Sequence, residues 1–256
     1  EIGVQLLERD FHNVRLTPAG VVMNNEMQNL MREIEAVIKR VQVTANITTN
    51  KFAIGILSGQ QIDNQILLTL RNLSDKYPKF SMDVKRMGYS DLIAELKASR
   101  LDIAETVVTE TTVLDPEIEC YSISTAKNYL IARLDDKIWN EEVSLKSVDG
   151  KTLVVAEEAH PGDDGLRRKI EEAGLHPIYR GVADMETHAL WLEAGMGVSI
   201  LNENNIIYSS RTFRPLKTAH ITELADAHIA LIWNKNHPAP LVDEFMTFIK
   251  SGLSRE

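Results

Sequence analysis

The order of strands and helices after Lys51 constrains the fold more than any other feature of the sequence. Short apolar runs alternate with longer amphipathic stretches, and glycine or proline separates many of them. Because a strand–helix–strand order needs right-handed crossovers between parallel strands, the pattern predicts doubly wound parallel sheets. The first unit is expected to contain strands over 52–57, 80–86 and 101–104, a helix carrying Ile62, Ile66, Leu67, Leu70 and Leu73, and a helix over 91–99.

A second unit repeats this order later in the chain. Two strands are expected first, over 117–121 and 129–132. The repeat itself has strands over 152–156, 178–182 and 198–201, with helices over 165–173 and 185–194 between them. A strand over 229–233 and a helix over 241–249 end the chain's predicted elements. We therefore predict an α/β fold of two doubly wound βαβ lobes joined by crossing strands. Lobe 1 is expected to contain residues 51–128 and 224–256, and lobe 2 residues 129–223.

A long amphipathic helix is predicted before the lobes, over residues 17–43. Thr17 can cap its first N–H groups, and Pro18 suits the first helical position. Its apolar residues follow the alternating spacing of a coiled-coil seam, and they are Met23, Met27, Leu30, Ile34, Val37 and Val41. The seam can pack on its own domain or on a second copy. The polar connector that follows, which completes a linker region over 17–50, favours dimerisation.

Composition narrows the function classes. The net charge of −9 and the pI near 5.4 argue against a surface that mainly binds nucleic acid. No apolar run is long enough to span a bilayer and no signal segment opens the chain, so a cytoplasmic protein without a membrane partner is expected. Cys120 is the single cysteine, and its apolar neighbours predict a buried, inert thiol.

The first twenty residues carry a family resemblance. The segment from Gly3 to Arg9 and the Leu-Thr-Pro-Ala-Gly entry at 16–20 resemble the wing and linker of LysR-type transcriptional regulators, although Leu7 stands where that family more often has Phe. The resemblance implies that residues 1–16 are a wing remnant, with Arg9 and Arg15 on the DNA side. The helix-turn-helix that precedes this wing in the family is absent from these residues, so the sequence is expected to be a fragment of the regulator.

Two later segments resemble the effector domain of the same family, which is itself similar to periplasmic solute-binding proteins. Residues 99–104 resemble a Gly-x-Leu-Asp-x-Ala strand entry with Ser99 in place of Gly. Residues 193–201 resemble the family's Ala-Gly-x-Gly-x-x-x-Leu-Pro segment, and Asn202 follows them where the family has Pro. The resemblance implies a two-lobed sensor of a small metabolite. It also implies a homodimer or homotetramer and contact with promoter DNA through the missing helix-turn-helix.

A ligand is expected in the cleft between the lobes, because the carboxyl ends of strands in open parallel sheets face a crevice. Helix capping is the alternative role for Ser58, Thr187 and above all Asp184. The acids near the mouth either disfavour a carboxylate ligand or point to solvent. The expected effector-binding residues are Ser58, Gly59, Gln60, Glu105, Thr106, Glu157, Asp184 and Thr187, with Glu158 and Glu186 beside them.

Signals for catalysis are weak. The sequence has no metalloprotease, nucleophile-elbow or phosphate-loop motif. The turn over 160–165 could bind a metal through its histidine, but no second His or Cys has ligand spacing, which favours a polar turn that caps a helix. We predict no catalytic residue, no metal and no cofactor. The alternatives are a solute-binding protein of a transport system with the same two lobes and an enzyme that uses the cleft.

Overall fold

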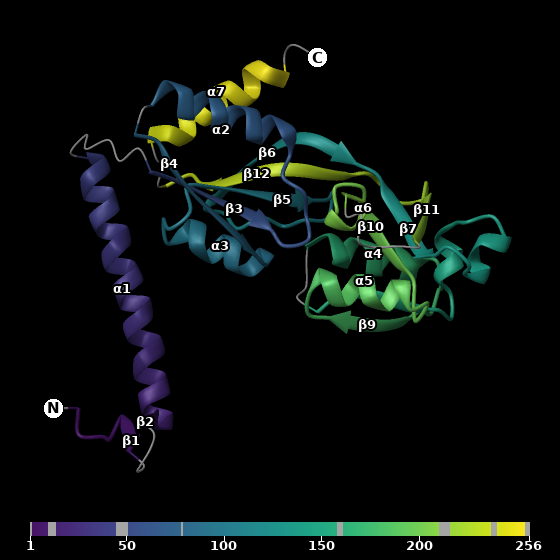
Figure 1. The fold of residues 1–256 in the computed structure, drawn as a ribbon, viewed down its shortest axis with the longest axis horizontal. Helices are drawn as coiled ribbons and strands as arrows, with labels where there is room; N and C mark the ends of the chain where they lie inside the picture. The colour runs from purple at the N-terminus through teal and green to yellow at the C-terminus, as the bar shows by residue number, and fades with distance from the viewer. Residues whose placement is uncertain are drawn as a thin grey trace.

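The computed structural model describes residues 2–9, 14–44, 51–77, 79–157, 161–209, 216–236 and 240–253. Figure 1 shows a body of two lobes, with helix α1 (Pro18–Thr44) extending away from it to a small N-terminal hairpin. The predicted connector over 45–50 and parts of the predicted turns at 160–165 and 236–240 lie outside the described residues. Among the described helices, none has the length and apolar character needed to cross a bilayer.

Lobe 1 is built on a five-stranded sheet with the order β4-β3-β5-β12-β6. Figure 1 shows α2 and α7 on one face of this sheet and α3 on the other. The strands are β3 (Lys51–Leu57), β4 (Ser81–Met87), β5 (Ile103–Val108), β6 (Ile118–Ala126) and β12 (Ala227–Asn234), and the helices are α2 (Asn64–Lys76), α3 (Tyr89–Lys97) and α7 (Pro240–Leu253).

The core of lobe 1 explains this arrangement. Strand β3 is buried along almost its whole length, as its continuous apolar run predicted. On one face, the rings of Phe52 and Phe245 stack with centroids 5.3 Å apart. On the other, Gly55 lets α3 approach closely, because a Cβ there would lie 2.5 Å from Leu92 Cδ2.

The strand directions differ in part from the prediction. Strands β4, β3 and β5 are parallel, but β12 is antiparallel to both β5 and β6, so the sheet is mixed. The reason is topological, since β12 enters the sheet on the return from lobe 2 and runs opposite to the βαβ strands. The α/β fold of two lobes is confirmed, and the lobe 1 sheet combines the parallel βαβ strands with an antiparallel strand that returns from lobe 2.

Lobe 2 combines an antiparallel sheet of order β10-β7-β11 with the parallel pair β8-β9. A parallel bridge between Leu153 and Val198 connects the two sheets. Strand β11 and helix α6 were not predicted. The elements are β7 (Asn128–Arg133), β8 (Thr152–Ala156), α4 (Pro161–Glu172), β9 (Ile178–Val182), α5 (Met185–Glu193), β10 (Ser199–Asn202), α6 (Ile206–Ser209) and β11 (Leu216–His220), with short 3-10 helices at Lys137–Asn140 and Leu145–Val148.

The N-terminal hairpin is joined to α1 as the sequence predicted. Strand β1 (Leu7–Arg9) pairs with β2 (Val14–Leu16) in antiparallel register. The Thr17 hydroxyl oxygen accepts from the Gly20 N–H at 2.9 Å, which confirms the cap, and it donates to the Gln5 carbonyl at 2.8 Å. Only glycine fits at position 20, because a Cβ there would lie 2.0 Å from the Leu6 carbonyl oxygen.

Cys120 is exposed, so the prediction of a buried thiol was wrong. It lies on β6, the edge strand of the lobe 1 sheet. The neighbouring Glu119, on the opposite face of the strand, is exposed as well.

Candidate functional site

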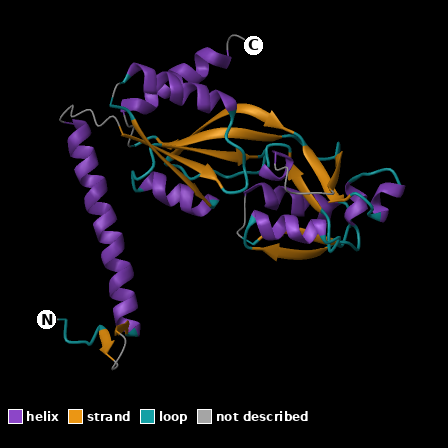
Figure 2. Ribbon diagram, in the orientation of Figure 1, coloured by secondary structure: helices purple, strands orange, loops and turns teal. Residues whose placement is uncertain are grey.

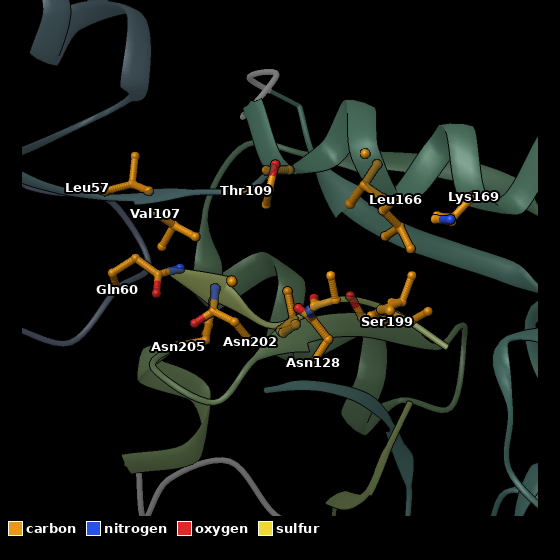
Figure 3. A pocket seen from close by; sticks show the side chains of 18 of the residues that line it. Leu57, Gln60, Val107, Thr109, Asn128, Leu166, Lys169, Ser199, Asn202 and Asn205 are labelled. Atoms are coloured by element: carbon orange, nitrogen blue, oxygen red, sulfur yellow. The ribbon is translucent and has the colours of Figure 1, made fainter. Parts of the chain in front are cut away.

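A cavity of about 210 Å³ lies between the two lobes. Its lobe 1 wall comes from the carboxyl ends of β3 and β5, and its lobe 2 wall from β8, α4, β10 and the loop after β10. Figure 3 shows Gln60 on the lobe 1 side pointing toward Asn205 on the lobe 2 side. The cavity therefore lies at strand ends, where an open α/β sheet is expected to bind its ligand.

Apolar and neutral polar side chains line the interior of this cleft. The charged side chains among its described lining residues are Glu110, Arg168 and Lys169, and all three are exposed. Lys169 also lies 3.6 Å from the Glu172 carboxylate. The hydroxyl and amide groups come from both lobes and are Ser58, Gln60, Thr109, Thr111, Asn128, Ser199, Asn202 and Asn205.

His188 and Ser199 form a fixed polar pair in the lobe 2 wall. Only 1% of each residue is exposed. The Ser199 hydroxyl donates to the Val154 carbonyl at 2.8 Å, so its oxygen accepts from Nε2 of His188 at 2.9 Å. Burial lowers the pKa of His188 to about 4, and the imidazole is therefore neutral at pH 7.

In this arrangement Ser199 accepts from His188 and does not donate to it. A serine nucleophile needs its hydroxyl proton directed at the imidazole base. Here the Ser199 proton is directed at the Val154 carbonyl, and His188 is the donor to Ser199. Among the described residues, no group of three or more His, Cys, Asp and Glu side chains is placed to hold a metal ion. The geometry is suited to binding through hydrogen bonds.

One rim of the cleft is closed by hydrogen bonds between the lobes. The Gln61 N–H donates to the Asn204 carbonyl at 2.8 Å, and the Asn204 side-chain amide donates to the Gln61 carbonyl at 3.0 Å. The Ile206 N–H donates to the Gly59 carbonyl at 2.9 Å. The loop after β3 is therefore held directly against the loop after β10.

The lobe 1 residues singled out in the sequence occupy two different environments. Ser58 and Gln60 line the cleft, and α2 is capped by Asp63, whose carboxylate accepts from the Gln65 N–H at 2.8 Å. Capping of α2 therefore does not explain Ser58. Gly59 adopts a φ of +82° between them. Glu105 and Thr106 are 1% and 0% exposed and do not belong to the described lining of the cleft.

Glu105 is a buried acid behind the cleft wall. One of its carboxyl oxygens accepts from the Asp63 N–H at 3.1 Å, and the other has no hydrogen-bond partner. Burial raises the pKa of Glu105 to about 8. Glu105 is therefore mostly protonated at pH 7, at the point where α2 begins.

In lobe 2, Asp184 takes the capping role that the sequence left open. Its carboxylate accepts from the Thr187 N–H at 2.7 Å, and this bond holds the pKa of Asp184 below its usual value. Glu157 is exposed, and neither Glu157 nor Thr187 belongs to the described lining of the cleft. Glu158 lies outside the described residues.

Several lining residues were missed in the sequence, above all Asn202 at the end of β10 and Asn205 after it. A signal for them was available. A strand was predicted over 198–201, and the rule of strand ends applied to it points to the residues that follow. In the structure, the parallel bridge between Leu153 and Val198 directs this strand end to the same cleft. The cluster of asparagines over 202–205 marks that strand end. His188 and Met185 gave no such signal, because helix α5 reads as an ordinary buried helix.

Comparison with known proteins adds a consistent set of matches. A family model described as the LysR substrate binding domain matches residues 51–254. The hydrogen peroxide-inducible genes activator of Dickeya chrysanthemi is 23% identical over 206 residues, which are 78% of this chain and 65% of that protein. The transcriptional dual regulator GltC of Bacillus subtilis is 21% identical over 262 residues, covering 100% of this chain and 85% of that protein.

Solved structures agree on the fold. The effector binding domain of QuiR in complex with shikimate has a TM-score of 0.68 at 14% identity, covering 80% of this chain and 98% of that chain. Full-length CbnR complexed with its target DNA has a TM-score of 0.62 at 19% identity, covering 98% of this chain and 85% of that chain. This chain spans 65% of the length of the Dickeya relative.

Proposed function

This chain belongs to the LysR family of transcriptional regulators, and from that premise we propose that a small effector bound between its lobes changes how the assembled regulator binds promoter DNA. The observation that carries the proposal is the cleft itself, to which both lobes contribute hydrogen-bonding groups. Gln60 and Thr109 come from lobe 1, and Ser199, Asn202 and Asn205 come from lobe 2. A ligand in contact with both sets stabilises one relative arrangement of the lobes.

The mechanism we propose is a population shift. A ligand changes the balance between two lobe arrangements only if it binds one of them better than the other. Polar groups on both walls supply that difference, because their contacts with one ligand depend on the distance between the walls. The QuiR structure, solved with shikimate, and that of the CcmR regulatory domain from Synechocystis, solved with 2-PG, support a small-molecule ligand for this fold.

Dimerisation through α1 is the second part of the proposal. Most of the predicted seam is exposed, with Leu30 at 51%, Ile34 at 46% and Val41 at 62%. A stripe of this kind on a helix that extends away from the lobes suits a second copy of the same helix (Figure 2). We propose a homodimer through residues 17–50 that can associate further into a tetramer.

Contact with promoter DNA is assigned to the N-terminal side of α1. We propose that residues 1–16 are a wing, in which Arg9 and Arg15 lie near the phosphate backbone. Arg15 is exposed on β2, opposite Glu8 of β1. We propose that lobe 1 contains residues 51–128 and 224–256 and that lobe 2 contains residues 129–223. The place of β12 in the lobe 1 sheet supports this division.

The family match favours a regulator over a transport solute-binding protein, and the named relatives are regulators of genes. We propose that the chain acts in the cytoplasm and is not an enzyme. Peroxide sensing, suggested by the names of several relatives, has less support. A disulfide within these residues would need a partner for Cys120, the single cysteine. Although Cys120 is exposed, the groups around its thiol desolvate it and raise its pKa, which lowers the thiolate fraction.

A metabolite screen by thermal shift tests the proposal, with every stabilising compound then added to promoter DNA and the whole regulator. A compound at a hundred times its dissociation constant is expected to stabilise the protein by about 2.7 kcal/mol. The same compound should change the dissociation constant for DNA. If stabilising compounds leave DNA binding unchanged, the sensing role is wrong.

A further inference from the structure

A smaller cavity of about 100 Å³ lies directly beside the cleft. Its other walls come from the start of α3 and from the segment before α5. The residues that line both spaces are Leu57, Ser58, Ala156, Met185 and His188. These shared residues form the boundary between the cleft and the smaller cavity, which we call the side pocket.

The two α5 residues in this boundary differ in how easily their side chains can change conformation. His188 is 1% exposed and is held by its hydrogen bond to Ser199. Met185 is half-buried and has an unbranched side chain whose three rotatable bonds adapt easily to different shapes. Its sulfur lies 3.9 Å from the side-chain nitrogen of Asn205, which is a weak contact. Met185 is therefore the part of the boundary that can move.

Gly59 provides the space in which Met185 lies. A Cβ at Gly59 would come within 3.0 Å of Cγ and 3.1 Å of the sulfur of Met185. The backbone of Gly59 is itself fixed, because its carbonyl accepts from the Ile206 N–H across the lobes. Met185 thus lies against rigid backbone on one side and an open cavity on the other.

We propose that the cleft continues past Met185 into the side pocket, so that this side chain determines how large an apolar group an effector can carry. The inference rests on the proposed function and specifies its ligand. The cleft offers hydrogen-bonding groups such as Gln60 and Asn202, and Leu57, Ala156 and Val182 give the side pocket apolar walls. The ligand class is a small molecule with a hydrogen-bonding core and a short apolar branch.

The size of the side pocket sets the size of that branch. An engineered apolar cavity of about 150 Å³ accepts benzene. The side pocket is smaller, so it suits a branched alkyl group better than an aromatic ring. Replacing Met185 by alanine is expected to join the two spaces and to admit the ring.

The test uses two probes, tert-butanol and benzyl alcohol, titrated into the whole chain with ¹³C-labelled leucine and alanine methyl groups. The methyls of Leu57 and Ala156 line both spaces and report binding. Met185→Ala is expected to raise the affinity for benzyl alcohol relative to tert-butanol at least tenfold. Met185→Phe is expected to lower the affinity for both probes. Leu190→Ala is the matched control, since Leu190 lies on the same helix and is 63% exposed.

The inference is overturned if the affinity for benzyl alcohol relative to tert-butanol is the same in Met185→Ala as in the wild type and Leu190→Ala. Failure of both probes to bind any of the proteins also overturns it, because the side pocket would then be closed to ligands. The proposed function is judged separately. A metabolite that alters promoter binding equally in the wild type and in Met185→Ala supports the regulator and contradicts the role of Met185.

Discussion

Replacing Glu105 by glutamine is expected to stabilise the protein more as pH rises. Glutamine has nearly the shape of a protonated glutamic acid and keeps an oxygen that accepts from the Asp63 N–H. The wild-type carboxyl is 1% exposed and its pKa is about 8 in the folded protein, against 4.5 in the unfolded chain. Below pH 4.5 both states hold the proton, and the contribution of this group to stability is fully present.

As pH rises from 4.5 toward 8, the unfolded chain loses the Glu105 proton while the folded protein keeps it, so the free energy of unfolding falls. One pKa unit corresponds to about 1.4 kcal/mol, which gives a loss of about 3 kcal/mol between about pH 6 and about pH 9. Glu105→Gln removes this dependence. Its stability advantage over the wild type should therefore grow by about 3 kcal/mol over that range.

Urea unfolding of both proteins at the two pH values measures this difference. Glu119→Gln is the control, because Glu119 is exposed on β6 and its substitution should change stability by less than about 0.5 kcal/mol at either pH. An advantage of Glu105→Gln that stays constant with pH would refute the assignment of a proton to Glu105. Arg86 and Asp63 are the charged groups near this carboxyl, and both are kept in the comparison.

Three further substitutions test other parts of the structure. Ser99 has a φ of +57°, which strains the backbone of a residue with a side chain, and its buried hydroxyl has no partner. Ser99→Gly should therefore raise the free energy of unfolding in urea by about 1 kcal/mol. A loss of stability would contradict backbone strain at this position. Gly20→Ala places a Cβ 2.0 Å from the Leu6 carbonyl oxygen, so amide exchange should become faster in the hairpin and the first turn of α1. Unchanged exchange would contradict the close contact between Gly20 and Leu6. Ile34→Glu should weaken self-association at least tenfold, about 1.4 kcal/mol, in sedimentation, while Gln28→Glu on the same helix should have little effect.

Much of the fold could be predicted because periodicity and turn residues act locally. Strands β8 and β9 begin and end at the predicted residues, and α1 begins with Pro18 after a Thr17 cap. The direction of β12 could not be predicted in this way. It depends on where the chain re-enters the lobe 1 sheet, which local patterns do not encode.

The candidate site was predictable only in part for the same reason. The rule of strand ends pointed to Ser58 and Gln60, which line the cleft. It also pointed to Glu105 and Thr106, whose side chains are buried inside lobe 1 because β5 continues to Val108. The true end of β5 places Val107 and Thr109 at the cavity, beyond the residues at which the predicted strand ended.

Hydrogen exchange of the whole chain with and without a stabilising metabolite tests the central claim most directly. If the ligand binds between the lobes, amide exchange should slow together over 57–61, from the end of β3, and over 202–206, from the end of β10 to the start of α6. Protection confined to one lobe, or to a surface away from both loops, would contradict the account.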